Sequence, residues 1–162
     1  MVEPSFLEFG ANIGMNAQAI KLLFPDSSYS GVEINKNAYL ELEKVADHAF
    51  LDSFEEFTGD QTYQVTFTKG VLIHLDPSSL DVAYEKLYQY TDKFMLIIEY
   101  YNPSPVAIEY RGNYDKLFKR DFAGEILAKF PDLHLADYGF VYHKGRFPQD
   151  DLTWFLLQKN GS

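Results

Sequence analysis

The sequence contains no cysteine, and no apolar stretch approaches the roughly 18 residues that a membrane-spanning helix needs. The absence of cysteine excludes a disulfide scaffold, a thiolate zinc site and a cysteine nucleophile. No signal-peptide pattern opens the chain, so we expect a cytoplasmic protein without a membrane partner. Apolar side chains are plentiful: 46% of the residues are hydrophobic and 17% aromatic, which excludes intrinsic disorder and predicts a substantial core.

Basic residues are also scarce. The chain has 14 Lys and Arg against 24 Asp and Glu, and this net charge of −10 argues against a nucleic-acid partner. The charge is unevenly distributed, because residues 1–60 hold three lysines and eleven acids. A later basic group consists of Arg111, Lys116, Lys119 and Arg120. An acidic first part and a basic group further on indicate two different ligand surfaces.

Apolar runs typical of strands alternate with amphipathic segments typical of helices. Strands are expected at residues 5–9, 29–34, 49–53, 64–68, 93–99, 133–143 and 152–159, and helices at 16–24, 37–46, 114–130 and after Asp76-Pro77. This alternation predicts an α/β, Rossmann-like, doubly wound fold with a mostly parallel seven-stranded sheet and an antiparallel last strand. We expect residues 1–162 to form one domain. Ligands of such sheets bind at the carboxyl ends of the strands.

A glycine turn joins the first expected strand to the first helix. Gly10 permits a tight turn, and Gly14 permits the helix to pack closely on the strand. Asn12 occupies the middle position of the G-x-G-x-x-G pattern, which argues against a dinucleotide and hence against a dehydrogenase. An ordinary strand-to-helix turn is the alternative interpretation.

Acidic side chains follow the second and third expected strands. Glu33 lies 23 residues after Gly10, a spacing at which an acid binds the ribose hydroxyls in doubly wound nucleotide folds. Asp52 and Ser53 end the third expected strand, where they are placed to contact the amino group of an adenine ring. A helix cap is the alternative interpretation for Asp52. Acids without a phosphate cradle favour a cationic nucleoside such as S-adenosylmethionine.

Two sets of motifs carry a resemblance over residues 5–159. The chain resembles the class I S-adenosylmethionine-dependent methyltransferases at Glu8–Gly14 (EFGANIG), Gly31–Asn35 (GVEIN) and Phe67–Pro77 (FTKGVLIHLDP). More narrowly, it is similar to the pseudaminic acid biosynthesis-associated methylase family at Glu99–Pro103 (EYYNP), Glu109–Gly112 (EYRG), Phe118–Gly124 (FKRDFAG), Asp137–Phe140 (DYGF) and Asp150–Phe155 (DDLTWF).

The resemblance implies a set of cofactor-binding residues. They are Glu8, Gly10, Ala11, Asn12, Gly14, Glu33, Ile34, Asp52 and Ser53, with backbone contacts at Thr68, Lys69 and Gly70. Methyltransferases of this class usually carry helices before the first strand, and this sequence lacks them. We therefore expect an open acceptor side. Either the chain is a truncated or minimal form, or a partner subunit covers that side, as a second copy in a homo-oligomer would.

Catalytic and acceptor-binding candidates lie after the fourth and fifth expected strands. His74 can exchange a proton near neutral pH and is a candidate base, with helix capping or core packing as the alternative. Glu99 and Tyr100 complete the catalytic candidates. The substrate-binding candidates are Tyr101, Asn102, Arg111, Lys119 and Arg120, with plain packing or a solvated helix face as the alternative. The remaining histidines lack metal-ligand spacing, so no metal is expected.

These observations predict an S-adenosylmethionine-dependent methyltransferase that acts on a small polar, acidic sugar-type metabolite of the pseudaminic acid pathway. The alternative is a non-catalytic or truncated S-adenosylmethionine-binding domain that serves as a binding or scaffold module.

Overall fold

A seven-stranded sheet with the strand order β3-β2-β1-β4-β5-β9-β8 forms the centre of the protein. The computed structural model describes residues 3–109, 112 and 117–161. Strands β1 to β5 are parallel, whereas β9 is antiparallel to both β5 and β8. The expected mostly parallel sheet is confirmed. The strands are β1 Ser5–Phe9, β2 Ser28–Val32, β3 His48–Phe50, β4 Tyr63–Lys69, β5 Thr91–Glu99, β8 Leu133–Val141 and β9 Leu152–Lys159.

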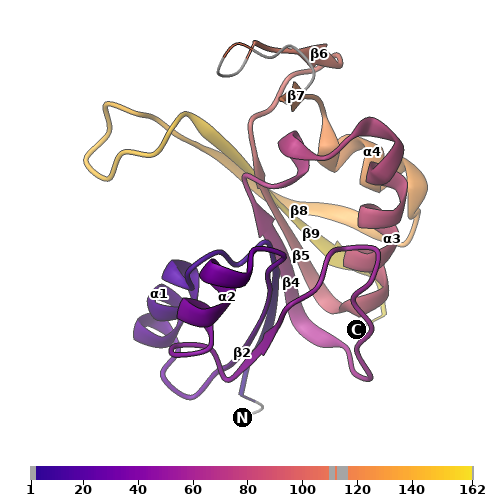
Figure 1. Ribbon diagram of the computed structural model, residues 1–162. Coiled ribbons are helices and arrows are strands. Elements are labelled where there is room, and N and C mark those ends of the chain that lie inside the picture. Colours follow the sequence, from indigo (N-terminus) through magenta and orange to yellow (C-terminus); the bar gives the residue numbers. More distant parts are fainter. Residues whose placement is uncertain (1–2, 110–111, 113–116, 162) are drawn as a thin grey trace.

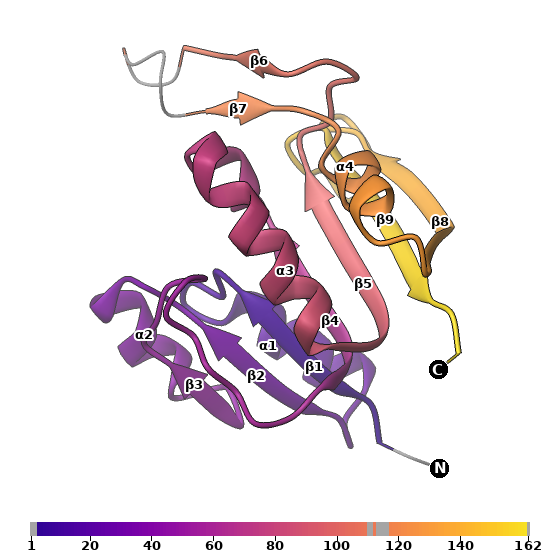
Figure 2. The ribbon, with the colours of Figure 1, turned by 90° about the vertical axis from the view of Figure 1, so that its right-hand side faces the viewer.

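Helices lie on both faces of this sheet (Figure 1 and Figure 2). α1 (Met15–Leu23) and α2 (Lys36–Leu42) pack on one face, and α3 (Leu80–Tyr90) and α4 (Phe122–Lys129) pack on the other. The doubly wound arrangement follows from right-handed crossovers between parallel strands. In the part of the chain that the structure describes, no helix is long and apolar enough to cross a membrane.

The central strands are apolar on both sides because both of their faces are covered. In β1, Leu7 and Phe9 point into the core beneath α3 and α4, whereas Phe6 points into the smaller core beneath α1 and α2. Met95 and Ile97 of β5 join the larger core and are fully buried. These alternating contacts fix the register of the sheet, since a slip by one residue exchanges the two faces.

The helix expected at residues 114–130 begins later than predicted. α4 starts at Phe122, because the Asp121 carboxylate accepts a hydrogen bond of 2.8 Å from the Gly124 N–H and caps the helix. Phe118 and Lys119 form a short strand, β7 (Phe118–Lys119), instead. It pairs antiparallel with β6 (Val106–Ala107) in a small second sheet. Residues 114–116 lie outside the described part of the chain.

Other boundaries also differ from the expectation, such as the end of α2 at Leu42 rather than at residue 46. The third strand spans His48–Phe50 rather than residues 49–53, so Asp52 and Ser53 lie in the loop after it. Asp76 caps as predicted, but its side chain accepts from the Ser78 N–H at the start of a 3-10 turn that leads into α3. An earlier 3-10 turn, η1 (Leu72–His74), follows β4.

Candidate functional site

The carboxyl ends of β1, β2 and β3 meet at one edge of the sheet, as parallel pairing requires. The backbone N–H groups of Gly10 and Ala11 both donate to the Val32 carbonyl oxygen, at 2.9 and 3.0 Å. The Glu33 N–H donates to the Phe50 carbonyl oxygen at 2.9 Å. The structure therefore brings the glycine turn and Glu33 together, as the sequence predicted. We call this region, residues 10–14, 33–35, 50–53 and 68–70, the carboxyl edge.

The glycine turn adopts left-handed backbone conformations. Gly10 and Gly14 have φ angles of 76° and 80°, and Asn12 between them has a φ of 49°. A Cβ atom on Gly10 would overlap the side chain of Val71, and one on Gly14 would overlap that of Val45. Glycine is required at both positions for backbone conformation and for close packing.

Glu33 is 8% exposed and connects two loops of the carboxyl edge. Its Oε2 accepts a hydrogen bond of 2.8 Å from the Asn12 N–H, and its Oε1 accepts one of 2.7 Å from the Asn35 N–H. A carboxylate has about four acceptor sites on its two oxygens, so these two bonds leave capacity for two more donors. The backbone thus holds the carboxylate in one orientation with acceptor capacity remaining.

Glu8 is a buried acid with partners inside the protein. Its Oε1 accepts a hydrogen bond of 2.7 Å from Asn16 Nδ2, and its Oε2 accepts one from the Tyr29 hydroxyl. Burial raises the pKa of Glu8 to about 7, while these two bonds and the charge of Lys69 lower it. Glu8 therefore ties β1 to α1 and β2. The sequence did not single out Tyr29 or Asn16, although an acid within an apolar strand is a signal that such partners exist.

Glu99 at the end of β5 holds the turn that follows β4. Its Oε1 accepts hydrogen bonds of 2.9 Å from the N–H groups of both Val71 and Leu72, at the start of η1. Its Oε2 is buried and has no hydrogen-bond partner among the described residues. Burial raises the pKa of this carboxyl to about 7, against the lowering effect of the backbone N–H groups. Glu99, a catalytic candidate in the sequence, thus positions η1.

The other catalytic candidates lie near the same edge. His74 is exposed at the end of η1. The Tyr100 ring lies 5.1 Å from Lys119 Nζ in a cation–π contact. Ile34 is exposed and lies two residues beyond the end of β2, and the Ser53 hydroxyl accepts a hydrogen bond of 3.2 Å from the Glu56 N–H. Ser53, rather than Asp52, therefore caps the turn that follows β3.

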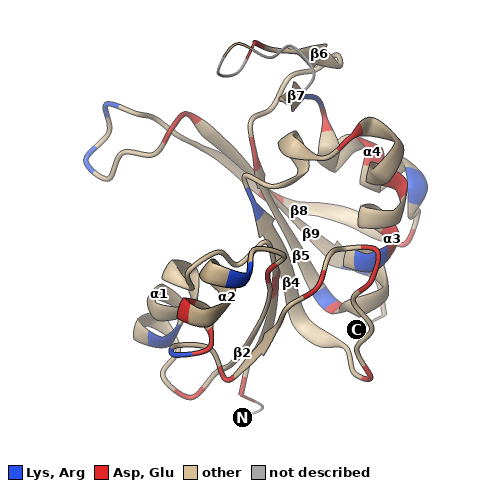
Figure 3. Cartoon of the chain, in the orientation of Figure 1, with Lys and Arg blue, Asp and Glu red and all other residues tan. Residues whose placement is uncertain are grey.

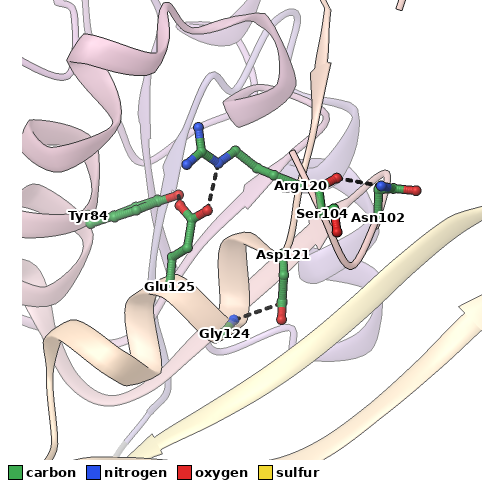
Figure 4. A network of polar contacts seen from close by, with 7 residues as sticks. All are labelled: Tyr84, Asn102, Ser104, Arg120, Asp121, Gly124 and Glu125. Carbon is green, nitrogen blue, oxygen red and sulfur yellow. Dashed lines mark hydrogen bonds and ion pairs between the residues drawn. The ribbon is translucent and has the colours of Figure 1, made fainter. Parts of the chain in front are cut away.

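Several acceptor-binding candidates already have partners within the protein (Figure 4). Arg120 Nε donates to Glu125 Oε1 at 2.6 Å, and the Tyr84 hydroxyl donates to Glu125 Oε2 at 2.6 Å. The Asn102 side chain donates to the Ser104 carbonyl oxygen. Tyr101 is 43% exposed and forms an isolated bridge with Arg120. Arg111 lies outside the described residues.

Two cavities lined by described residues lie beside different strands of the sheet. One of about 740 Å³ lies beside β3 and the start of β4, with His48, Gly59 and Tyr63 in its wall. Another of about 430 Å³ adjoins the carboxyl edge, because Asn16 and Lys69 line it together with residues of β5 and β9. Among the described residues, no group of three or more His, Cys, Asp or Glu side chains could hold a metal ion.

Comparison with known proteins identifies the fold. No family model and no curated protein matches the sequence. Among solved structures, the chain is similar to the O-methyltransferase of a trans-AT PKS multienzyme from Brevibacillus brevis, solved with S-adenosyl-L-homocysteine. That match has a TM-score of 0.71 and 15% identity, and it covers 96% of this chain and 66% of that one.

Two further solved structures of methyltransferases match the same fold. A SAM-dependent methyltransferase from Methanosarcina mazei matches with a TM-score of 0.71 and 10% identity, covering 98% of this chain and 94% of that one. The 1,6-didemethyltoxoflavin-N1-methyltransferase of Burkholderia thailandensis, solved with its substrate and S-adenosylhomocysteine, matches with a TM-score of 0.76 and 13% identity. It covers 96% of this chain and 71% of that one. The chain therefore has the fold of the class I S-adenosylmethionine-dependent methyltransferases.

Proposed function

We propose that this protein binds S-adenosylmethionine at the carboxyl edge and transfers its methyl group to a small-molecule acceptor. The observation that carries the proposal is the Glu33 carboxylate, which Asn12 and Asn35 hold beside the glycine turn. It is supported by the fold, which the chain shares with methyltransferases that were solved with S-adenosylhomocysteine.

The residues present fit the groups of this cofactor. The remaining acceptor capacity of Glu33 suits two ribose hydroxyls. Asp52, in the loop after β3, is available for the adenine amino group. No side chain caps α1, so its first N–H groups and its dipole favour a carboxylate at that end. The backbone of residues 68–70 borders the same space.

When bound, the cofactor supplies a methyl group on a sulfonium; the acceptor's oxygen or nitrogen forms a bond to that carbon, the sulfur–carbon bond breaks, and the acceptor's proton leaves to a base or to water. The protein's contribution is to hold the two reactants in line and close together. His74 is exposed next to this edge, and we propose it as the base where the acceptor is a hydroxyl.

The acidic, sugar-type acceptor of the pseudaminic acid pathway is a narrower proposal that rests on the motif resemblance. Lys119 beside Tyr100 supports it, since a cation and an aromatic ring suit an anionic ring compound. Arg120 gives less support, because Glu125 already pairs with it. The cytoplasmic location and the covering second copy are likewise proposals.

A non-catalytic binding module is the second candidate. The internal pairing of Arg120, Glu99 and Asn102 favours it, because these side chains serve the fold rather than a ligand. Incubation with radiolabelled S-adenosylmethionine and a metabolite extract separates the two candidates. Transfer of label to any extract component excludes the non-catalytic module, and retention of all label on intact cofactor excludes turnover.

Calorimetric titration with S-adenosylmethionine tests the binding step. We expect saturable binding to the wild type and an affinity at least about tenfold lower in Glu33→Ala, because hydrogen bonds to a charged group contribute about 1.5–3 kcal/mol. Glu41→Ala is the matched control, since Glu41 is an exposed acid of α2 that pairs with Lys44. Equal binding by the wild type and Glu33→Ala, or no binding by either, contradicts the proposal.

A further inference from the structure

The turn that follows β4 connects the glycine turn to the end of β5. β1, β4 and β5 are neighbours in the sheet, so the segments that leave their carboxyl ends lie side by side (Figure 1). Gly10 follows β1, Val71 lies between β4 and η1, and Glu99 is the last residue of β5. Contacts among these three residues join parts of the edge that are distant in the sequence.

Glu99 holds the backbone of this turn. The Gly70 N–H donates to the Ile98 carbonyl oxygen, and the N–H groups of Val71 and Leu72 donate to Glu99 Oε1, each at 2.9 Å. Gly70 has a left-handed φ of 65° and Val71 is right-handed, an alternation that makes successive N–H groups converge on one anion. Because Glu99 is 3% exposed, these hydrogen bonds are shielded from water. The end of β5 thus fixes the start of η1.

The side chain of Val71 contacts the glycine turn. A Cβ atom on Gly10 would overlap a methyl group of Val71, so the valine lies directly against residue 10. The backbone N–H of the same valine is held by Glu99. Because packed side chains leave little free space, a displacement of the glycine turn presses on Val71, and a displacement of η1 removes the support of Gly10.

His74 is the last residue of η1 and is exposed. Its N–H donates to the Val71 carbonyl oxygen at 2.9 Å, so the backbone of His74 follows the position of Val71. A 3-10 turn of three residues has few hydrogen bonds of its own, and its position therefore depends on its partners. The position of the imidazole depends in this way on Glu99, although the two residues are 25 positions apart.

We propose that Glu99 is a positioning residue for His74, and that Val71 couples the position of His74 to binding of the cofactor at the glycine turn. Glu99 acts through η1 rather than by contact with a reactant. The inference rests on the proposed function, which assigns the cofactor to the carboxyl edge and the role of base to His74. It adds that the two are linked, so that a ligand beside Gly10 changes the surroundings of His74.

Two variants of Glu99 test the positioning without any ligand. Glu99→Ala removes the acceptor of two N–H groups, so amide hydrogen exchange at Val71 and Leu72 should accelerate at least about tenfold, and the NMR signals of the His74 ring should move. Glu99→Gln keeps an acceptor oxygen and should restore both the slow exchange and the His74 signals. This rescue separates positioning from a general loss of stability.

The matched control is an acid on the same side of the sheet. Charged residues lie along α3 and α4 (Figure 3), and one of them, Glu125 of α4, has its partners Arg120 and Tyr84 outside η1. Glu125→Ala should leave amide exchange at Val71 and Leu72, and the His74 signals, as they are in the wild type.

S-adenosylhomocysteine is the probe for the coupling. In the wild type its addition should shift the His74 ring signals, with the same Kd as calorimetry gives. Glu99→Ala should bind it about tenfold more weakly, because only a fraction of the molecules then hold η1 in the binding-competent position. Val71→Ala keeps the backbone bonds to Glu99 but loses the contact with Gly10. Its His74 signals should resemble the wild type without ligand and should lose most of their response to the ligand.

Two results overturn the inference. One is amide exchange at Val71 and Leu72 that is equal in the wild type and folded Glu99→Ala, or that Glu99→Gln fails to restore. The other is a full response of His74 to the ligand in Val71→Ala, since the ligand would then act on His74 directly. Val71→Ala leaves Glu99 in place, so it decides the coupling even where circular dichroism shows that Glu99→Ala is unfolded. Failure of the proposed function has a different signature, which is no binding of S-adenosylhomocysteine by the wild type.

Discussion

The two halves of the sheet differ in how their side chains are satisfied. In the half formed by β1, β2 and β4, the Glu33 carboxylate at the carboxyl edge accepts hydrogen bonds from the N–H groups of Asn12 and Asn35. In the half formed by β5, β9 and β8, apolar side chains such as Ile98 and Trp154 remain partly exposed on one face. The first half therefore ends in a polar carboxyl edge, and the second presents an apolar surface.

The packing around one glycine in each half gives the prediction with the largest expected effect. Gly10→Ala places a Cβ at a left-handed φ and against the branched Val71 side chain, so unfolding free energy should fall by about 3 kcal/mol. In Gly139→Ala the nearest atoms to the new Cβ belong to the indole ring of Trp154, which is partly exposed and can shift, so the substitution should cost about 1 kcal/mol. Urea unfolding measures both values, and Trp154 emission should shift only in Gly139→Ala. Equal losses would contradict the contrast in packing.

The two buried acids allow a comparison by pH. Burial raises the pKa of Glu8 and of Glu99 from 4.5 to about 7. A raised pKa means that each carboxyl stabilises the fold fully below about pH 4.5, and that this contribution is lost as the pH rises through about 7. Wild-type unfolding free energy should therefore decrease by about 1–3 kcal/mol per group between about pH 5 and pH 8.

Glutamine variants assign this pH dependence to its residues. Glu99→Gln should be more stable than the wild type near pH 8, because a neutral amide keeps the bonds from Val71 and Leu72 without a buried charge. Glu8→Gln should also flatten the profile, but it loses about 1 kcal/mol at every pH, since one of its two donors, Asn16 or Tyr29, then faces an NH₂ group. Chemical denaturation at several pH values measures both, and an unchanged slope in the two variants would refute the assignment.

The smallest predicted effect concerns the start of α4. Asp121→Ala removes the acceptor of the Gly124 N–H and should lower unfolding free energy by about 1 kcal/mol. Asp81→Ala, at an exposed position of α3, is the control and should cost less than half as much. Binding of S-adenosylmethionine should not change in either variant, because α4 lies away from the carboxyl edge. A loss of cofactor affinity in Asp121→Ala would show that the two halves are coupled.

Local sequence patterns predicted the first half of the molecule well. The glycine turn and the acid after β2 are read from neighbouring residues, and both lie where parallel pairing puts them. The second half depends on contacts between distant residues. Arg120, a candidate for substrate binding, instead pairs with Glu125. The same Glu125 carboxylate accepts a hydrogen bond from Tyr84, which lies on α3 and is distant in the sequence. The apolar face that Trp154 shares with Ile98 depends on the pairing of β5 with β9, so no pattern in neighbouring residues predicts it.

Chemical-shift mapping with S-adenosylhomocysteine tests the central claim most directly. The ligand is titrated into isotope-labelled protein, and backbone amide shifts are followed. The account predicts that the largest changes fall on the carboxyl edge, at Gly10, Asn12, Asn35 and Gly70. Changes confined to the opposite cavity, around His48 and Gly59, or no changes at all, would contradict it.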